Sequence, residues 1–137
     1  MTAPLRLAPL LLALACLPVL AGPKVTIETR PDGTVVSYDP TSRAREENWS
    51  TIWYELKWAK PRDCGERGCV VVTSIKDAFD CATYRRGRIA SIDLGPDGKM
   101  LNTGEREPRM VFIPDNDNTG RVLFNAACGA KGERKSS

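Results

Sequence analysis

The cysteines are the residues of this sequence whose type and spacing bear most directly on chemistry. Of the five, Cys16 lies in an apolar N-terminal stretch, which leaves Cys64, Cys69, Cys81 and Cys128. Four residues separate Cys64 from Cys69, so this is not a thioredoxin-type C-x-x-C centre, and the wider spacings do not suit a four-cysteine zinc site. An even set of cysteines in an exported chain is expected to form disulfides.

Four cysteines permit three pairings, and the spacing favours one of them. Cys64 and Cys69 flank a short turn between two extended segments, so a local bridge closes easily and Cys81 is left for Cys128. Alternation of residue types over 79–83 places Cys81 in the middle of a strand, on the face of Phe79. The long bridge is therefore expected to join the end of the chain to the centre of a sheet.

The usual catalytic groups are missing from the composition. The chain has no histidine, which removes the commonest general base and metal ligand and excludes serine–histidine and cysteine–histidine nucleophile systems. No glycine-rich phosphate loop occurs. Paired carboxylates could be built from several acids, but their spacing singles out no pair: Glu28, Asp39, Glu55, Asp77 and Asp80. We therefore expect a protein that is not an enzyme and that carries no cofactor.

Residues 1–21 have the pattern of an export signal. Arg6 precedes an apolar run from Leu7 to Leu20, which is shorter than the roughly 20 apolar residues of a membrane-spanning helix and is interrupted by two prolines. Cleavage is expected between Ala21 and Gly22. In an alternative interpretation Cys16 is the lipidated first residue of a lipoprotein, although the apolar residues that continue beyond it are atypical of that signal.

The remaining chain has the length of one domain, residues 22–130, followed by a polar tail over 131–137 that is expected to be disordered. Its strands are predicted by alternation and by turn residues such as Asp32-Gly33 and Pro96-Asp97-Gly98. The expected strands cover 25–29, 34–38, 50–60 and 70–73, consecutive strands within 79–101, and 109–113. The polar stretch 43–48 is expected to cross between strands.

The strand over 50–60 carries the candidate binding residues. Ile52, Tyr54, Leu56 and Trp58 fall on one face and are expected to be core. Trp53 falls on the other face, with Glu55 and Lys57 beside it. A large aromatic residue on the outer face of a sheet is either covered by a helix or available to a partner. These three residues are the predicted partner-binding site, and a sheet edge that pairs with a second copy is the alternative, which would make a homodimer.

The C-terminal region is predicted to be a helix from about Thr119 to Cys128. Its apolar stripe would contain Val122, Leu123, Ala126 and Ala127, and Gly129 would end it. The preceding Asp115–Gly120 segment resembles the start of a calcium loop, but the twelfth position is Ala126, which has no carboxylate for the ion. A turn and a helix N-cap explain it better.

The charge balance gives no reason to expect nucleic-acid binding. The net charge is +3, and clusters such as Arg85, Arg86 and Arg88 alternate with acids and lack neighbouring aromatic residues. A solvated surface of mixed charge is the expected outcome.

Several short motifs together resemble the surface-adhesin protein E family of exported proteins from Gram-negative bacteria. They are the segment Tyr38-Asp39-Pro40-Thr41-Ser42 after an Asp-Gly hairpin, the tryptophan-bearing Ile52-Trp53-Tyr54, Phe79-Asp80-Cys81 with Tyr84-Arg85, and Phe112-Ile113-Pro114 before a helix that ends in Cys128. The poor lipoprotein signal and the additional Cys64–Cys69 segment depart from the family's pattern.

The resemblance implies an α+β fold, with an antiparallel sheet of about six strands, a C-terminal helix on one face and a Cys81–Cys128 disulfide. It also implies a binding module of the periplasm, outer membrane or cell surface, because founding members are outer-membrane lipoproteins that bind host matrix and serum proteins. Contact with the membrane is expected only through a lipid anchor. The alternative function is a periplasmic inhibitor or a stress or scaffold protein that acts on an envelope enzyme.

Overall fold

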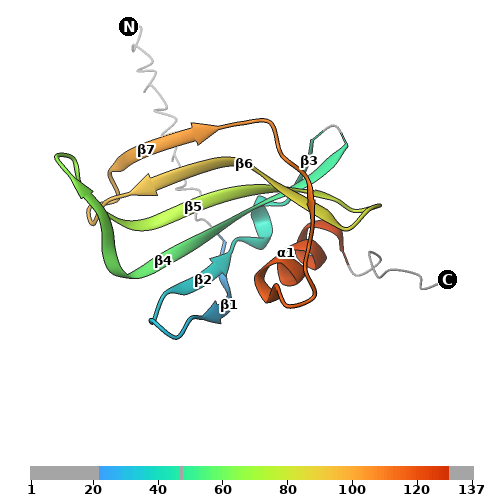
Figure 1. Cartoon of the computed structure of the whole chain (residues 1–137), viewed down its shortest axis with the longest axis horizontal. Coiled ribbons are helices and arrows are strands. Elements are labelled where there is room, and N and C mark those ends of the chain that lie inside the picture. Colours follow the sequence, from blue (N-terminus) through green and yellow to red (C-terminus); the bar gives the residue numbers. More distant parts are fainter. Residues whose placement is uncertain (1–21, 47, 130–137) are drawn as a thin grey trace, which may run out of the picture.

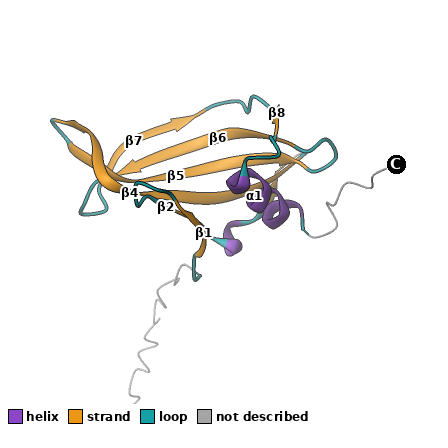
Figure 2. Ribbon diagram, turned by 60° about the horizontal axis from the view of Figure 1, so that its bottom comes forward, coloured by secondary structure: helices purple, strands orange, loops and turns teal. Residues whose placement is uncertain are grey.

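The computed structural model describes residues 22–46 and 48–129, which form one antiparallel sheet with an α-helix on one face (Figures 1 and 2). The expected signal over 1–21, the lipidation site Cys16, the cleavage residue Ala21 and the tail 131–137 lie outside the described residues. The elements in chain order are β1 (Val25–Thr29), β2 (Val35–Tyr38), the short 3-10 helix η1 (Pro40–Ser42), β3 (Ala44–Glu46), β4 (Trp49–Gly65), β5 (Gly68–Asp80), β6 (Arg85–Leu94), β7 (Met100–Glu105), β8 (Val111–Phe112) and α1 (Asn118–Cys128).

The sheet has eight strands, so the expectation of about six is wrong. Six follow one another in the order β1-β2-β4-β5-β6-β7, while β3 pairs with β4 and β8 pairs with β6. The three residues of β3 are all exposed and lie within the stretch 43–48 that was expected only to cross between strands. An exposed strand of three residues has no apolar alternation, so its backbone pairing leaves no signal in the sequence.

β4 and β5 form the long central hairpin of the sheet. Residues 74–78, which no expected strand covered, belong to the single strand β5, because Ser74 to Ala78 each pair with a residue of β4 and with a residue of β6. The Cys64–Cys69 disulfide closes the hairpin at its tip. Both disulfides have the pairing that the spacing favours.

The helix α1 closes the core on one face of the sheet. Asp117 is its N-cap, and one carboxylate oxygen of this residue accepts a hydrogen bond from the Gly120 backbone N–H at 2.8 Å. Buried Leu123, Phe124 and Ala127 face the sheet, so Phe124 belongs to the apolar stripe although the sequence analysis left it out. They pack against the sheet residues Val36, Ile52, Tyr54, Leu56, Ile75 and Phe79, together with Ile113.

Gly120 allows α1 to lie close to the segment that precedes it. A Cβ atom placed on this residue would be 2.8 Å from the Ile113 side chain and 2.5 Å from a carboxylate oxygen of Asp117. Any larger residue would therefore push the first turn of the helix away from both. The glycine is required by packing here, not by an unusual backbone conformation.

The Cys81–Cys128 disulfide lies at the end of the sheet. β5 ends at Asp80, and Cys81 follows it in the turn that leads to β6. The expectation of a mid-strand cysteine at the sheet centre is thus wrong. The bridge instead joins the last residue of α1 to the turn of the β5–β6 hairpin. Tyr84 lies in the same turn, and its ring centre is 4.5 Å from that of Phe124.

Candidate functional site

The sheet has one open face, opposite α1, and Trp53 lies at its centre. Strand register places Trp53 of β4 beside Lys76 of β5, and Lys76 beside Ala90 of β6. Because residues that face each other across antiparallel strands share a face, these three side chains form one row. α1 packs on the other side, and none of the described strands lies across this face (Figure 2).

Two hollows meet at Trp53 on this face. The first has a volume of about 260 Å³ and is lined on the β2 side by Lys24, Ser37 and Glu55 among others. The second, of about 560 Å³, extends across β6 to Thr103 and Glu105 of β7. Trp53 itself is half-buried, so part of the indole ring is available to a ligand.

Ion pairs surround the tryptophan and limit the charge of the face. Lys24 Nζ lies 2.5 Å from Glu55 Oε2, and Lys76 pairs with Glu46. Lys57 is exposed on the same face but lines neither hollow. The structure therefore brings Trp53 and Glu55 together in one hollow and leaves Lys57 outside it.

Sequence reasoning missed the residues that β5 and β6 contribute to this face. Ser74 lies beside Glu55, and Ile92 lies beside Ser74. Alternation over 90–94 places Ala90, Ile92 and Leu94 on one face of a strand. It carried no information on which strand would be their neighbour, and hence none on their proximity to Trp53.

On the other face of the sheet, next to α1, the structure buries a charged cluster. Asp77 is only 4% exposed, and Tyr54 of β4 and Arg86 of β6 lie close to it. Arg86 joins the sheet to the helix: one terminal nitrogen lies 2.7 Å from the carboxylate of the N-cap Asp117, and the other lies 3.8 Å from Asp77. One carboxylate oxygen of Asp77 has no hydrogen-bond partner within the described chain.

Burial governs the pKa values in this cluster. Desolvation raises the pKa of Asp77, and the neighbouring guanidinium groups of Arg86 and Arg88 only partly oppose it. Desolvation, with a contribution from the nearby Asp77 charge, raises the pKa of Tyr54 to about 12. In the sequence Asp77 is one acid among many, because nothing in its spacing reveals that the folded chain buries it.

Stability should therefore depend on pH through Asp77. A carboxyl group whose pKa is higher in the folded than in the unfolded chain favours folding when protonated, so its contribution is greatest below pH 3.8 and is lost as pH rises through the folded pKa. The free energy of unfolding of the wild type, minus that of Asp77→Asn, should increase from pH 7 to pH 4, by at most ~1.4 kcal/mol per pH unit. Urea titrations at several pH values measure this difference.

Asp115→Asn, the same change at an exposed position, is the comparison for that experiment. The difference in free energy of unfolding between the wild type and Asp115→Asn should vary less with pH than the difference between the wild type and Asp77→Asn. The raised pKa of Asp77 would be contradicted if the free energy of unfolding of the wild type, minus that of Asp77→Asn, stayed constant with pH or increased toward neutral pH.

Neither a cluster of metal-binding side chains nor a membrane-spanning helix is found among the described residues. Within 22–46 and 48–129, no three histidine, cysteine, aspartate or glutamate side chains are grouped closely enough to hold a metal ion. The four cysteines of this part are all in disulfides. Over the same residues, no helix is both long enough and apolar enough to cross a membrane.

The arrangement of strands and helix is shared with solved structures. Protein E from non-typeable Haemophilus influenzae matches with a TM-score of 0.59 over 80% of this chain and 78% of that chain, at 10% sequence identity. A second structure of Haemophilus influenzae protein E gives a TM-score of 0.50 over 69% of this chain and 80% of that chain, at 11% identity.

The chain has a protein E-like fold. No protein-family model matches the sequence, and no curated protein matches it. The protein E-like fold that the motifs predicted is thus confirmed by structure, with an eight-stranded sheet in place of the expected six strands. At 10% and 11% identity the similarity to protein E concerns the fold alone, and it leaves the residues of the open face to be interpreted from their own chemistry.

Proposed function

We propose that this protein is an exported, non-enzymatic binding module of the bacterial envelope that binds a protein partner through the open face around Trp53. The observation that carries the proposal is the position of Trp53, half-buried between two hollows on a sheet face that α1 leaves uncovered. A tryptophan in such a position offers a large rigid contact area at a small cost in side-chain entropy.

The surroundings of Trp53 suit a protein partner better than a small polar ligand. Aliphatic Ile92 and Ala90 lie on the same face, and the ion pairs Lys24–Glu55 and Lys76–Glu46 lie at its margin. An apolar centre with a polar margin is the common composition of protein interfaces. The absence of histidine and the protein E-like fold support a binding role over catalysis.

Trp53→Ala tests this proposal. Tagged wild-type protein and the variant are used to recover partners from the envelope fraction of the producing bacterium, and retained proteins are quantified by mass spectrometry. A partner bound through Trp53 should be retained at least tenfold less by Trp53→Ala, because loss of a central aromatic contact costs ~2 kcal/mol or more.

The matched control is Trp49→Ala, the same substitution in the same strand at a half-buried residue that lines neither hollow. It should retain the partner at wild-type levels. Circular dichroism establishes that both variants are folded. Equal retention by the wild type, Trp53→Ala and Trp49→Ala would overturn the assignment of the open face.

The alternative is a periplasmic inhibitor or a stress or scaffold protein that acts on an envelope enzyme. The same recovery experiment distinguishes it, because the retained protein would then be an enzyme whose activity falls when purified wild-type protein is added. A non-enzymatic surface protein would favour the adhesion-type role.

A further inference from the structure

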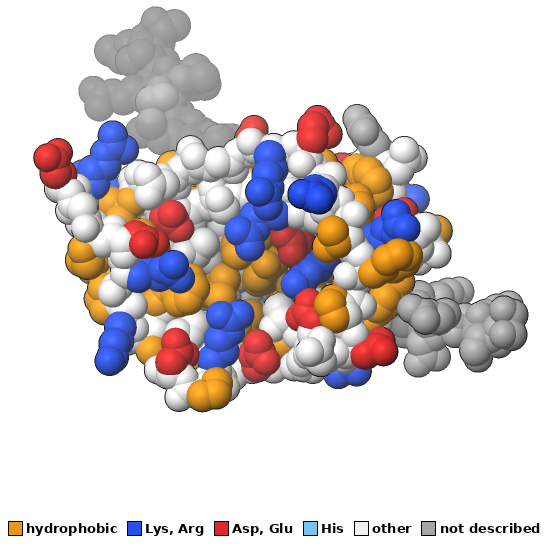
Figure 3. Space-filling view, in the orientation of Figure 1, with side chains coloured by type: hydrophobic (Ala, Val, Ile, Leu, Met, Phe, Trp, Pro, Cys, Tyr) orange, Lys and Arg blue, Asp and Glu red, His pale blue; other side chains and the backbone are white. Residues whose placement is uncertain are grey.

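A groove of about 600 Å³ lies on the helix-bearing face of the sheet, where α1 does not cover it. Its walls are the segment before α1, the β1–β2 hairpin and the end of the β4–β5 hairpin. Figure 3 shows Lys and Arg side chains interspersed with Asp and Glu side chains over the molecule, with hydrophobic side chains between them. This groove and the hollows around Trp53 lie on opposite faces of the sheet.

A row of polar side chains crosses the floor of the groove. The indole N–H of Trp58 donates to Thr73 Oγ1 at 2.9 Å, and the Thr73 hydroxyl donates to Asp93 Oδ1 at 2.8 Å. Asn102 adds a longer contact of 3.5 Å to the second oxygen of Asp93. The row spans β4 to β7 and satisfies its own hydrogen bonds, so these side chains are held in place without a ligand.

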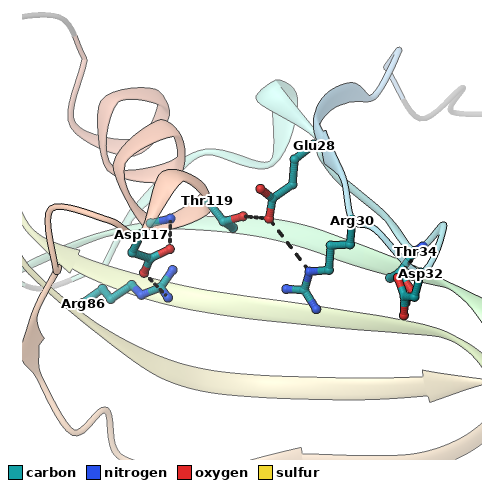
Figure 4. Close-up of polar contacts among 8 residues, drawn as sticks. Glu28, Arg30, Asp32, Thr34, Arg86, Asp117 and Thr119 are labelled. Atoms are coloured by element: carbon teal, nitrogen blue, oxygen red, sulfur yellow. Dashed lines mark hydrogen bonds and ion pairs between the residues drawn. The ribbon is translucent and has the colours of Figure 1, made fainter.

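The carboxylates that line the groove are engaged within the protein. Thr119 Oγ1 donates to Glu28 at 2.8 Å, and Asp117 pairs with Arg86 (Figure 4). Arg62 Nε lies 3.2 Å from Asp63. An incoming cation would have to compete with these existing donors.

Two of the arginines retain donors that the protein does not use. Arg30 is 42% exposed, and only its Nε approaches a carboxylate, that of Glu28, at 3.8 Å. Its terminal nitrogens have no acceptor among the described residues, and its side chain points over the strands of the sheet (Figure 4). Arg88 of β6 is exposed at the same groove, close to Tyr54 and Asp77. A guanidinium group has five N–H donors, so both arginines can bind a further acceptor.

We propose that this groove binds the carboxylate side chains of an acidic peptide segment, with Arg30 and Arg88 as the groups that recognise them. Four arginines and four carboxylates line the groove, so its formal charge is zero. Selectivity therefore comes from directional hydrogen bonds between guanidinium and carboxylate groups, and not from a net positive field. Leu56 and Ile75 also line the groove, so the aliphatic parts of glutamate side chains have apolar atoms to contact.

The site is a second binding surface that goes beyond the proposed function and does not depend on it. Because Trp53 and Trp58 are on opposite faces of β4, their indole N–H groups report on the two surfaces separately. A two-dimensional ¹H–¹⁵N NMR titration with hexaglutamate, blocked at both termini, should shift the Trp58 indole signal and leave that of Trp53 in place. Blocked hexaglutamine should shift neither.

Arg30→Gln and Arg88→Gln test the two arginines. Each variant should bind hexaglutamate about tenfold more weakly, since each loses one charge-assisted interaction. Arg45→Gln, the same change on the exposed strand β3 away from the groove, should bind as the wild type does. Trp53→Ala should also bind hexaglutamate as the wild type does. Failure of the partner-recovery experiment and failure of the hexaglutamate titration can therefore be told apart.

Three results would overturn the inference: equal shifts with hexaglutamine, shifts at Trp53 without shifts at Trp58, or unchanged affinity in Arg30→Gln and Arg88→Gln. The dispersion of the NMR spectrum shows whether each variant is folded. If either glutamine variant is unfolded, Arg30→Lys and Arg88→Lys keep the charge and lose the two-pronged geometry, and unchanged affinity in both lysine variants would equally overturn it.

Discussion

Replacing Phe124 with alanine is expected to lower the free energy of unfolding by about 3–5 kcal/mol. Phe124 is 1% exposed and lies where α1 meets the sheet. Its ring packs edge-on against Phe79, with ring centres 6.2 Å apart, and against Tyr84 at 4.5 Å. The Cys81–Cys128 bridge joins the end of α1 to the turn after β5, which limits how far the helix can move to fill the cavity.

Phe112→Ala is the matched control for that substitution. Phe112 is 62% exposed, and its main described contact is the guanidinium group of Arg85, 4.2 Å above its ring. Its loss should cost about 1 kcal/mol or less. Guanidinium chloride titrations of the oxidised proteins measure both values. Equal losses for the two variants would mean that Phe124 is not part of a packed core.

The two disulfides are expected to differ in their contribution to stability. In the loop-entropy account, a bridge that closes a longer loop restricts the unfolded chain more. The sequence separation is 47 residues for Cys81–Cys128 and 5 for Cys64–Cys69. Removing the first bridge by replacing both cysteines with alanine should cost about 4 kcal/mol, and removing the second about 2 kcal/mol.

The comparison is made by chemical denaturation of the two double-alanine variants beside the wild type, without reductant. Each variant serves as the control for the other, because each loses two cysteine sulfur atoms and one disulfide bridge. A larger loss from the Cys64–Cys69 variant would show that residual structure in the unfolded chain, and not loop length, dominates. It would also indicate that the hairpin tip contributes more to the fold than its exposed position suggests.

The two surfaces proposed for binding differ in how they could be found. Trp53 stands out in the sequence because the alternation over 50–60 is regular, so its outward position follows from counting. The groove could not be found in this way. Arg30, Arg88 and Trp58 come from three distant segments, and only the pairing of β1, β2, β4, β5 and β6 brings them to one place.

The errors in the predicted fold have one cause: they concern segments whose structure is set by backbone hydrogen bonding between strands. β3 consists of exposed residues, and β5 continues through Ser74–Ala78 because β4 and β6 bond it on both sides. Cys81 was placed in a strand because the alternation of Phe79, Cys81 and Thr83 continues past the point where the chain turns. Side-chain alternation does not record where backbone hydrogen bonding stops.

The sequence by itself determined the features that depend on neighbouring residues. These are the hairpin at Asp32-Gly33, the inward face of β4, the helix that ends at Cys128 and the favoured disulfide pairing, since turn chemistry, side-chain period and loop length are all local properties. Tertiary structure alone decided which face α1 covers, how deeply Asp77 is buried and which arginines share a groove. The physical reason is that desolvation and side-chain contact depend on residues far away in the chain, whose positions are set only when strands pair and the helix packs.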